Sequence, residues 1–325
     1  MKKIKNFIYL DNQKMYSISS QLFEGLTEYM VKSERKTGTD KVEQKGDFGS
    51  GKLMADIIEN ESSNSEKKFL HHYAYNLFED ELKSSNKILE LTRTNIDGEI
   101  VSIEDINFVK VTGKIGFNDS KFIGETLRDF NKIGEAFAYT QYNEQFKALE
   151  DERKQAISST KDRNQKHKLK NLTPQDSIIK SLAADNGMYL DPKLTESMRT
   201  ILEFGYGSSF DVQMPIEAID KGYLFSALLD RNYLTEPEQS IIKKYSRESE
   251  KEFTIFGIVT QSKKRDSKES IYARAVAAMQ TTSDDSRMKE AMMNMIAALT
   301  NLENLFVGKL DYEYIIDPIA IYREI

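Results

Sequence analysis

The sequence predicts an α+β protein. Short apolar runs rich in β-branched and aromatic residues, such as FIYL at 7–10 and EFTIFGIVTQ at 252–261, are typical of strands. Elsewhere, as at 119–149, apolar residues recur every three or four positions, the period of an amphipathic helix. Because strands and helices do not alternate regularly, we expect antiparallel-rich sheets rather than a doubly wound parallel sheet.

In the first half, Asp11 and Asp119 each precede a helical pattern and are expected to cap it. Residues 33–50 are polar and contain three glycines, so they predict an exposed, mobile loop. Asp97-Gly98 predicts a turn between two strands. We expect strands at 7–10, 87–94 and 106–117, and helices at 12–31, 51–60, 65–83 and 119–149.

The second half follows a very polar segment, where we place the domain boundary. Its expected helices are 174–186, 192–203, 237–245 and 284–307, and its expected strands are 210–216, 223–229 (which could equally be helical), 252–261, 312–317 and 318–325, the last two separated by Pro318. The predicted organisation is therefore two mixed domains, 1–150 and 174–325, joined by a polar, basic helical arm or linker at 151–173.

Composition limits the function. The 325 residues include no cysteine, which excludes disulfides and thiol chemistry and favours a reducing cytoplasm. The net charge of −6 argues against a dedicated nucleic-acid binder. The apolar run after MKKIKN is too short for a signal peptide, and no run approaches a spanning length, so we expect no membrane insertion.

GDFGSGKL at 46–53 partly matches a phosphate-binding loop, with Gly46, Gly51 and Lys52 in place. Leu53 replaces the hydroxyl residue that would hold magnesium, and no buried strand precedes the motif. We favour an ordinary glycine loop, and we predict no cofactor.

Catalytic and metal-binding residues are not assigned. The three histidines are His71, His72 and His167, and neighbouring histidines on a helix point about 100° apart, so the first two cannot chelate one ion. In the expected helix at 65–83, Phe69, Tyr73 and Leu77 are expected to form the apolar stripe, with Leu82 as a further candidate. The acidic run 79–81 is interpreted as a solvated helix face.

Two segments are candidate contact surfaces. The first is a basic cluster that would attract nucleic-acid phosphates, although basic linkers are common. Its members are Arg153, Lys154, Lys161, Arg163, Lys166, Lys168 and Lys170. The second is a methionine-rich stripe with heptad spacing, Met288, Met292, Met295 and Leu299. Packing on the C-terminal sheet is the favoured interpretation of this stripe, and an oligomer or partner interface is the alternative.

Several segments carry a resemblance to a known family: FIYLD, YSISSQLFEGLTEY, HHYAYNLFEDEL, VKVTGKI and DPIAIYREI. With them the chain resembles DUF6414, an uncharacterised bacterial and archaeal family of unknown function, along nearly its whole length. These segments are typical of a fold and have no assigned catalytic role, so the resemblance transfers no site residue. It implies an accessory role, with phage defence as one context.

We therefore expect a non-enzymatic cytoplasmic interaction, sensor or scaffold protein that assembles with itself or with a protein partner. A nucleic-acid- or nucleotide-binding protein, acting through 46–53 or 153–170, is the alternative. A toxic effector is a third interpretation.

Overall fold

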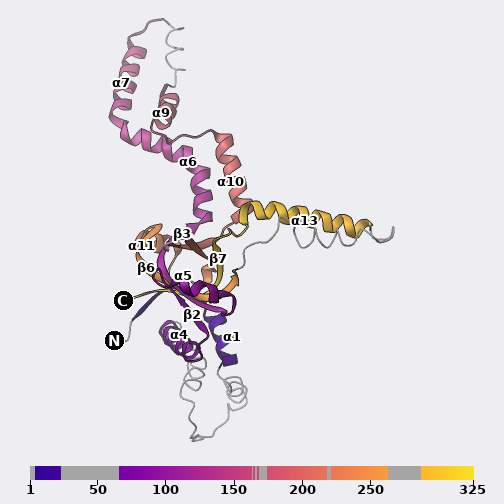
Figure 1. Ribbon diagram of the computed structural model, residues 1–325. Helices are drawn as coiled ribbons and strands as arrows, with labels where there is room; N and C mark the ends of the chain where they lie inside the picture. Colours follow the sequence, from indigo (N-terminus) through magenta and orange to yellow (C-terminus); the bar gives the residue numbers. More distant parts are fainter. Residues whose placement is uncertain are drawn as a thin grey trace, which may run out of the picture. The chain divides into compact units, whose positions relative to one another are not determined.

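A computed structural model gives the arrangement of the chain (Figure 1). It describes residues 4–22, 66–162, 164, 167, 174–217, 221–262 and 287–325. The expected loop at 33–50 and the expected helix at 51–60 lie outside the described residues.

Helices and strands follow one another irregularly along the described chain, and the α+β class is confirmed. Their bounds are β1 Lys5–Leu10, α1 Asn12–Leu22, α4 Glu66–Ser84, β2 Ile88–Leu91, α5 Ile96–Glu99, the 3₁₀ helix η1 Ile100–Glu104, β3 Phe108–Asp119, α6 Ser120–Gln141, α7 Asn143–Ser159, α9 Pro174–Asp185, α10 Pro192–Tyr206, β4 Phe210–Glu217, β5 Gly222–Leu228, the 3₁₀ helix η2 Arg231–Tyr233, α11 Glu238–Tyr245, β6 Glu248–Gln261, α13 Arg287–Val307 and β7 Glu313–Glu324.

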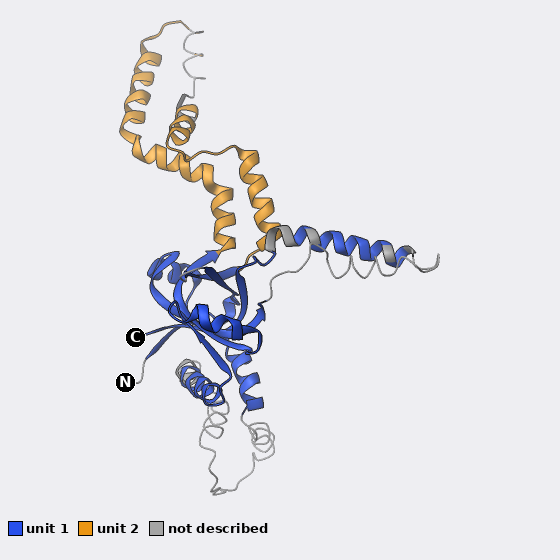
Figure 2. Ribbon diagram, viewed as in Figure 1, with its two compact units in different colours: residues 1–118, 210–325 blue, residues 119–209 orange. Residues whose placement is uncertain are grey.

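The chain divides into two compact units (Figure 2). Unit 1 combines residues 1–118 with 210–325, and unit 2 is the stretch between them, 119–209. This division differs from the expected domains 1–150 and 174–325. The physical reason is that strands from both ends of the chain hydrogen-bond in one sheet, as β1 does with β7, so the halves cannot form separate cores.

Five strands of unit 1 close into a ring. β4 is antiparallel to β5, β5 runs parallel to β7, and β6 is antiparallel to both β7 and β3. β3 lies beside β4, which completes a barrel in the order β3-β4-β5-β7-β6. β1 and β2 extend the sheet by pairing with β7 and β3.

The connectivity of this ring is that of an OB-fold barrel. Numbered by their order in the chain, its strands run 1-2-3-5-4, with the third and fifth parallel, and the helix α11 lies between the third and fourth. The connection between the first two strands contains all of unit 2, and the connection between the last two contains α13. The two largest insertions therefore occupy the loop positions that flank the ligand-binding face of such barrels.

Side chains of β7 alternate between two cores, as the period of two in a strand requires. Ile321 belongs to the inner cluster of the barrel, together with residues such as Val111 and Phe253. Its neighbours Ala320 and Tyr322 belong to the outer cluster, which α1 and α4 cover. The barrel thus has a filled interior and one helix-covered outer face.

Several sequence expectations are confirmed. The Asp119 carboxylate accepts a hydrogen bond from the Phe122 backbone N–H at the start of α6, and Asp11 does the same for Lys14 at the start of α1. Residues 223–229 fall mainly in a strand, β5, rather than in a helix.

Two expectations are wrong. Asp97-Gly98 does not form a hairpin turn: it lies in α5, and β2 and β3 are parallel, an arrangement that requires a crossover connection. Pro318 does not break the last strand, because β7 continues through it. The pairing with β6 shifts register between Phe256 and Gly257, directly beside Pro318, which accommodates the residue that lacks an N–H.

Unit 2 consists of the helices α6, α7, α9 and α10. Residues of α6 make close contacts with α10 and with the backbone of residues 188–190. Leu202 of α10 lies against Gly124 of α6. The Asn131 side chain donates to the Leu190 carbonyl and accepts from the Leu190 N–H, both at 2.9 Å. Gly134 is buried so closely against the Met188 carbonyl that a Cβ atom there would approach its oxygen to 1.9 Å.

Candidate functional site

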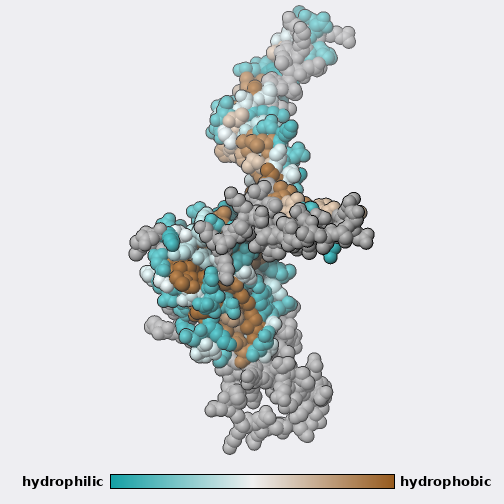
Figure 3. All heavy atoms as spheres, turned by 45° about the vertical axis from the view of Figure 1, so that its right-hand side comes forward, coloured by the Kyte–Doolittle hydropathy of each residue, from teal (hydrophilic) through white to brown (hydrophobic). Residues whose placement is uncertain are grey.

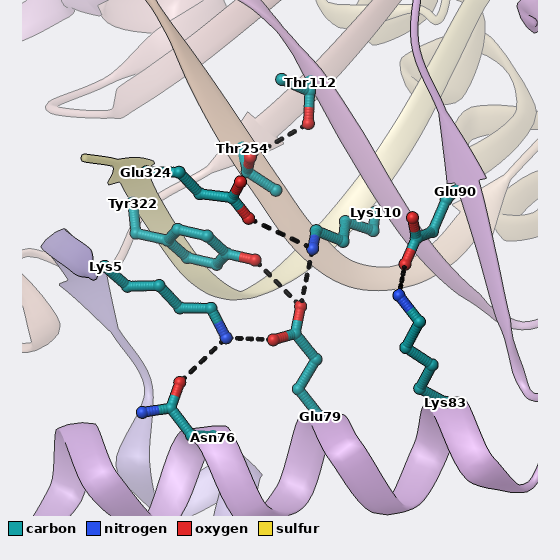
Figure 4. A network of polar contacts seen from close by, with 10 residues as sticks. All are labelled: Lys5, Asn76, Glu79, Lys83, Glu90, Lys110, Thr112, Thr254, Tyr322 and Glu324. Atoms are coloured by element: carbon teal, nitrogen blue, oxygen red, sulfur yellow. Dashed lines mark hydrogen bonds and ion pairs between the residues drawn. The ribbon is translucent and has the colours of Figure 1, made fainter. Parts of the chain in front are cut away.

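A buried carboxylate in unit 1, Glu79 of α4, joins side chains from three elements (Figure 4). Lys5 of β1 forms an ion pair with Glu79 Oε2. Lys110 Nζ of β3 lies 3.1 Å from the other carboxylate oxygen, Oε1. The Tyr322 hydroxyl of β7 donates to the same Oε1 at 2.9 Å. Glu79 therefore ties the helix to three strands of the sheet.

The two lysines of this network have further partners. Lys5 Nζ donates to Asn76 Oδ1 at 2.9 Å, from the preceding turn of α4. Lys110 Nζ lies 3.4 Å from Glu324 Oε1. Lys5 Nζ also lies 4.8 Å from the centre of the Tyr75 ring, within cation–π range. Each ammonium group thus has several favourable contacts in a largely buried place.

These contacts shift the proton affinities. Burial by itself would raise the pKa of Glu79, but the charges of Lys5 and Lys110 outweigh burial and hold that pKa below its ordinary 4.5. Burial would lower the pKa of Lys110, and the Glu79 carboxylate outweighs this and raises that pKa above 10.5. Burial and the nearby Glu79 charge raise the pKa of the Tyr322 hydroxyl far above its usual range.

The arrangement favours a structural clamp over a catalytic site. A general base needs a pKa near the working pH, and the pKa of Glu79 is shifted in the opposite direction. Both of its oxygens are already in contact with cations or a hydroxyl. Within the described residues, no group of three potential metal ligands converges.

The two adjacent histidines have different partners. His71 Nδ1 lies 2.5 Å from the Tyr16 hydroxyl, and its Nε2 lies 3.4 Å from the Asn12 amide. The His72 ring stacks on Phe7, with ring centres 4.5 Å apart. The two imidazoles therefore point in different directions, as the helical geometry predicts.

The acidic run at 79–81 does not behave as one solvated face, contrary to expectation, because its first member is the buried Glu79. The sequence carries a signal for this. Tyr75, Phe78 and Leu82 form a buried stripe on α4, and Glu79 lies four residues after Tyr75 and three before Leu82, on the same side of the helix. Of the expected stripe, Leu82 is buried and Leu77 is partly buried, but Tyr73 is 43% exposed and does not belong to it. The side chain of Phe69 lies outside the described residues.

Of the two candidate phosphate-binding segments, the structure describes no part of the glycine loop at 46–53 and only part of the basic cluster at 153–170. Gly46, Gly51 and Lys52 lie outside the described residues, as do Arg163, Lys166, Lys168 and Lys170. Arg153 and Lys154 lie on α7, and Lys161 follows it. The Lys154 ammonium is 3.3 Å from Glu150 and 3.6 Å from Asp151, so this part of the basic cluster lies among carboxylates.

The methionine-rich stripe of α13 is exposed, contrary to the favoured interpretation that it packs on the C-terminal sheet. Met288 is 78% exposed, Met292 54%, Met295 56% and Leu299 50%. Ala297, which projects from the opposite side of the helix, is buried. The covered side of α13 is thus not the side that carries the predicted stripe.

A second exposed apolar stripe, on α10, was not assigned from the sequence. Leu194, Met198 and Ile201 are each between 43% and 50% exposed, and no residue of α10 is fully buried. Their spacing of four and then three is the signal that could have identified them. Hydrophobic side chains, brown in Figure 3, reach the surface along the helices of unit 2.

A comparison with known protein families gives a match. A family model described as "Domain of unknown function (DUF6414)" matches residues 4–322. Searches of curated proteins and of solved structures found no match to the chain. No helix in the described ranges is long and apolar enough to cross a bilayer. Because the family model covers nearly all of the 325 residues, this chain belongs to the DUF6414 family, a domain of unknown function.

Proposed function

We propose that this protein is a non-enzymatic scaffold that binds other polypeptides through helices inserted into two connections of its barrel. The observation that carries the proposal is the pair of exposed apolar stripes, Leu194–Met198–Ile201 on α10 and Met288–Met292–Met295–Leu299 on α13. Runs of exposed apolar residues at heptad spacing are typical of helix–helix contacts between chains.

The position of these helices supports the proposal. Each stripe lies in a connection that, in OB-fold barrels, flanks the binding face. Fold alone does not determine function, so the argument depends on the surface chemistry of the helices. On α13 that chemistry is mainly methionine, whose flexible side chain adapts to a partner surface.

The buried network around Glu79 is consistent with a stabilising role inside unit 1. Its lysines and carboxylates neutralise one another inside unit 1, and its pKa shifts favour the charged pair over proton transfer. The proposal therefore assigns binding to the exposed helices and stability to the clamp.

The test uses tagged full-length protein expressed in its native cells. The α10 double variant Met198→Glu/Ile201→Glu and the α13 double variant Met292→Glu/Met295→Glu each place charge in one stripe. Thr200→Glu, on an exposed position of α10 outside its stripe, is the matched control. We expect wild type and control to retain the same associated polypeptides, or the same oligomer by light scattering, and at least one stripe variant to lose them.

Two results would contradict the proposal: a chain that is strictly monomeric and retains no polypeptide, or associations that survive both stripe variants unchanged. Exposed positions tolerate charge, so we expect each variant to keep its fold. Circular dichroism of each variant checks this and so distinguishes loss of binding from loss of folding.

Nucleic-acid binding is a second candidate, since OB-fold barrels often bind oligonucleotides and the basic cluster lies in the first of the two connections. The surface chemistry of the barrel argues against it. The outward positions of β4 and β5 that face neither core, Gln213, Pro215, Glu217 and Leu228 among them, include no aromatic or basic side chain. Titration of labelled single-stranded RNA across a salt series decides between the two, because phosphate contacts weaken steeply as salt rises.

A further inference from the structure

The helix α13 has two opposite sides with different environments. Met293, Ala297 and Thr300 are partly or fully buried and lie on one side. The stripe on the other side is exposed and, within the described side chains, comprises Met288, Met292, Met295, Leu299 and Leu302. A helix that buries one side in its own chain while exposing a heptad stripe on the other has the form of a contact surface.

The residues beside the stripe identify its partner. Lys289, Ile296 and Glu303 are spaced by seven residues and therefore form one flank of the stripe. This flank carries a positive charge at one end, an apolar residue in the middle and a negative charge at the other end. It is complementary to itself when it is reversed end for end.

We propose that α13 pairs with α13 of a second copy of this chain, in an antiparallel orientation centred near Ile296. The inference rests on the proposed function and names the partner of one of its two stripes. In this register Met295 packs against Leu299 of the second copy, and Met292 packs against Leu302. Lys289 lies beside Glu303 of the second copy, and the two-fold axis repeats this charge pair.

A parallel pair does not have this complementarity. Lys289 would face the same region of the second copy, and Glu303 would lie about 21 Å further along the axis, at 1.5 Å per residue. The other flank carries Ala291 and Ala298, which offer no opposite charge and whose small side chains permit close approach. Charge therefore favours the antiparallel orientation over the parallel one.

Charge reversal tests the orientation. Lys289→Glu alone and Glu303→Lys alone each place like charges together twice, and we expect each to weaken the dimer roughly tenfold in sedimentation velocity. The double variant restores both pairs with reversed sign and is expected to return to the wild-type dissociation constant. An equimolar mixture of the two single variants forms a complementary heterodimer. Asn294→Asp, on the exposed surface away from the flank, is the matched control and leaves the dimer unchanged.

Crosslinking tests the register independently, and the absence of cysteine from the chain gives a clean background. Met295→Cys and Leu299→Cys chains are mixed and treated with a short bis-maleimide linker. We expect the mixed product to exceed either homodimer product, because residues 295 and 299 face each other only in the antiparallel register. Preferential Met295→Cys homodimer crosslinking would overturn the inference in favour of a parallel pair.

The outcomes separate this inference from the proposed function. A wild-type chain that stays monomeric at about 100 µM, above the dissociation constants of ordinary weak dimers, overturns the self-pairing of α13. If that monomer still binds another polypeptide and loses it in Met198→Glu/Ile201→Glu, the proposed function stands. A dimer that survives Met295→Glu also overturns the inference, since it must form elsewhere.

Discussion

At the scale of single residues, the main feature is one carboxylate held by two lysines in a place with little water. Transfer of three charged groups from water carries a large desolvation cost, and the mutual attraction of Glu79, Lys5 and Lys110 offsets it. Such a group is weak evidence for added stability, but removal of one member leaves buried charge without compensation.

We predict that Glu79→Ala lowers the free energy of unfolding by about 3 kcal/mol, because it leaves Lys5 and Lys110 largely buried without their shared carboxylate. Asp80→Asn, on the exposed next residue of α4, is the control and changes stability by less than about 0.5 kcal/mol. Urea unfolding followed by circular dichroism measures both. Equal effects of the two substitutions would show that the clamp contributes nothing specific.

Glu79 and Lys110 also make the stability of the fold depend on pH, each with a defined sign. The folded-state pKa of Glu79 is lowered, so its contribution is present above pH 4.5 and is lost as the pH falls through the folded-state value. The pKa of Lys110 is raised, so its contribution is present below pH 10.5 and is lost as the pH rises further. In Glu79→Ala both dependences should flatten, and an unchanged stability profile against pH would contradict the clamp.

At the scale of elements, the helix α4 shows how much the sequence could predict. Its existence followed from apolar periodicity, but its orientation did not, because the segment supports two stripes and the predicted one ran through the exposed Tyr73. The buried stripe through Tyr75 includes a charged residue, Glu79, and its partners Lys5 and Tyr322 lie 74 and 243 residues away in the sequence. Local pattern carries no information about such partners, so the clamp could not be predicted.

Close backbone contact inside unit 2 gives a further prediction. Gly134→Ala places a Cβ atom 1.9 Å from the Met188 carbonyl oxygen, so backbone must move, and we expect unit 2 to lose about 3 kcal/mol of stability. Gly124→Ala, in the same helix α6, meets only the Leu202 side chain at 3.6 Å, an ordinary contact. It should gain up to about 1 kcal/mol from helix propensity.

Thermal unfolding of the two alanine variants, followed at 222 nm, measures this difference. Because both substitutions are identical in chemistry and lie on one helix, propensity contributes equally to both, and only the contact with Met188 differs. Equal melting temperatures would mean that α6 does not approach residue 188 as closely as the structure shows.

At the scale of the whole molecule, the barrel explains why the expected domain boundary is misplaced. Individual strands were predicted well, since their signals are local. The ring closes where β6 pairs with β3 and with β7, and β1 adds to the same sheet by pairing with β7. These pairings join residues far apart in the sequence, and the local pattern of a strand does not reveal its partner. A long polar segment in the middle of the sequence therefore indicated a boundary, although it lies within an insertion.

If unit 2 is an insertion, the barrel should fold without it. The two residues that flank the proposed deletion, Ser120 and Ser209, are already neighbours. The Ser120 N–H donates to the Ser209 carbonyl at 3.0 Å, and their two hydroxyl oxygens are 3.0 Å apart. Beneath them, Asn118 donates to Asp211 at 3.1 Å. Joining Ser120 to Ser209 through Asn-Gly therefore needs only a tight hairpin connection, whose closure costs little entropy.

We predict that this deletion variant unfolds cooperatively, retains its strand signal in circular dichroism and shows the same loss on Glu79→Ala as the full chain, because the clamp and both cores lie in unit 1. It should also retain any self-association through α13 and lose whatever the α10 stripe binds, since α10 is removed with unit 2. A variant that is unfolded, or that no longer responds to Glu79→Ala, would mean that the barrel depends on residues 121–208 for its stability and that unit 2 is a structural part of the core rather than an appended binding element.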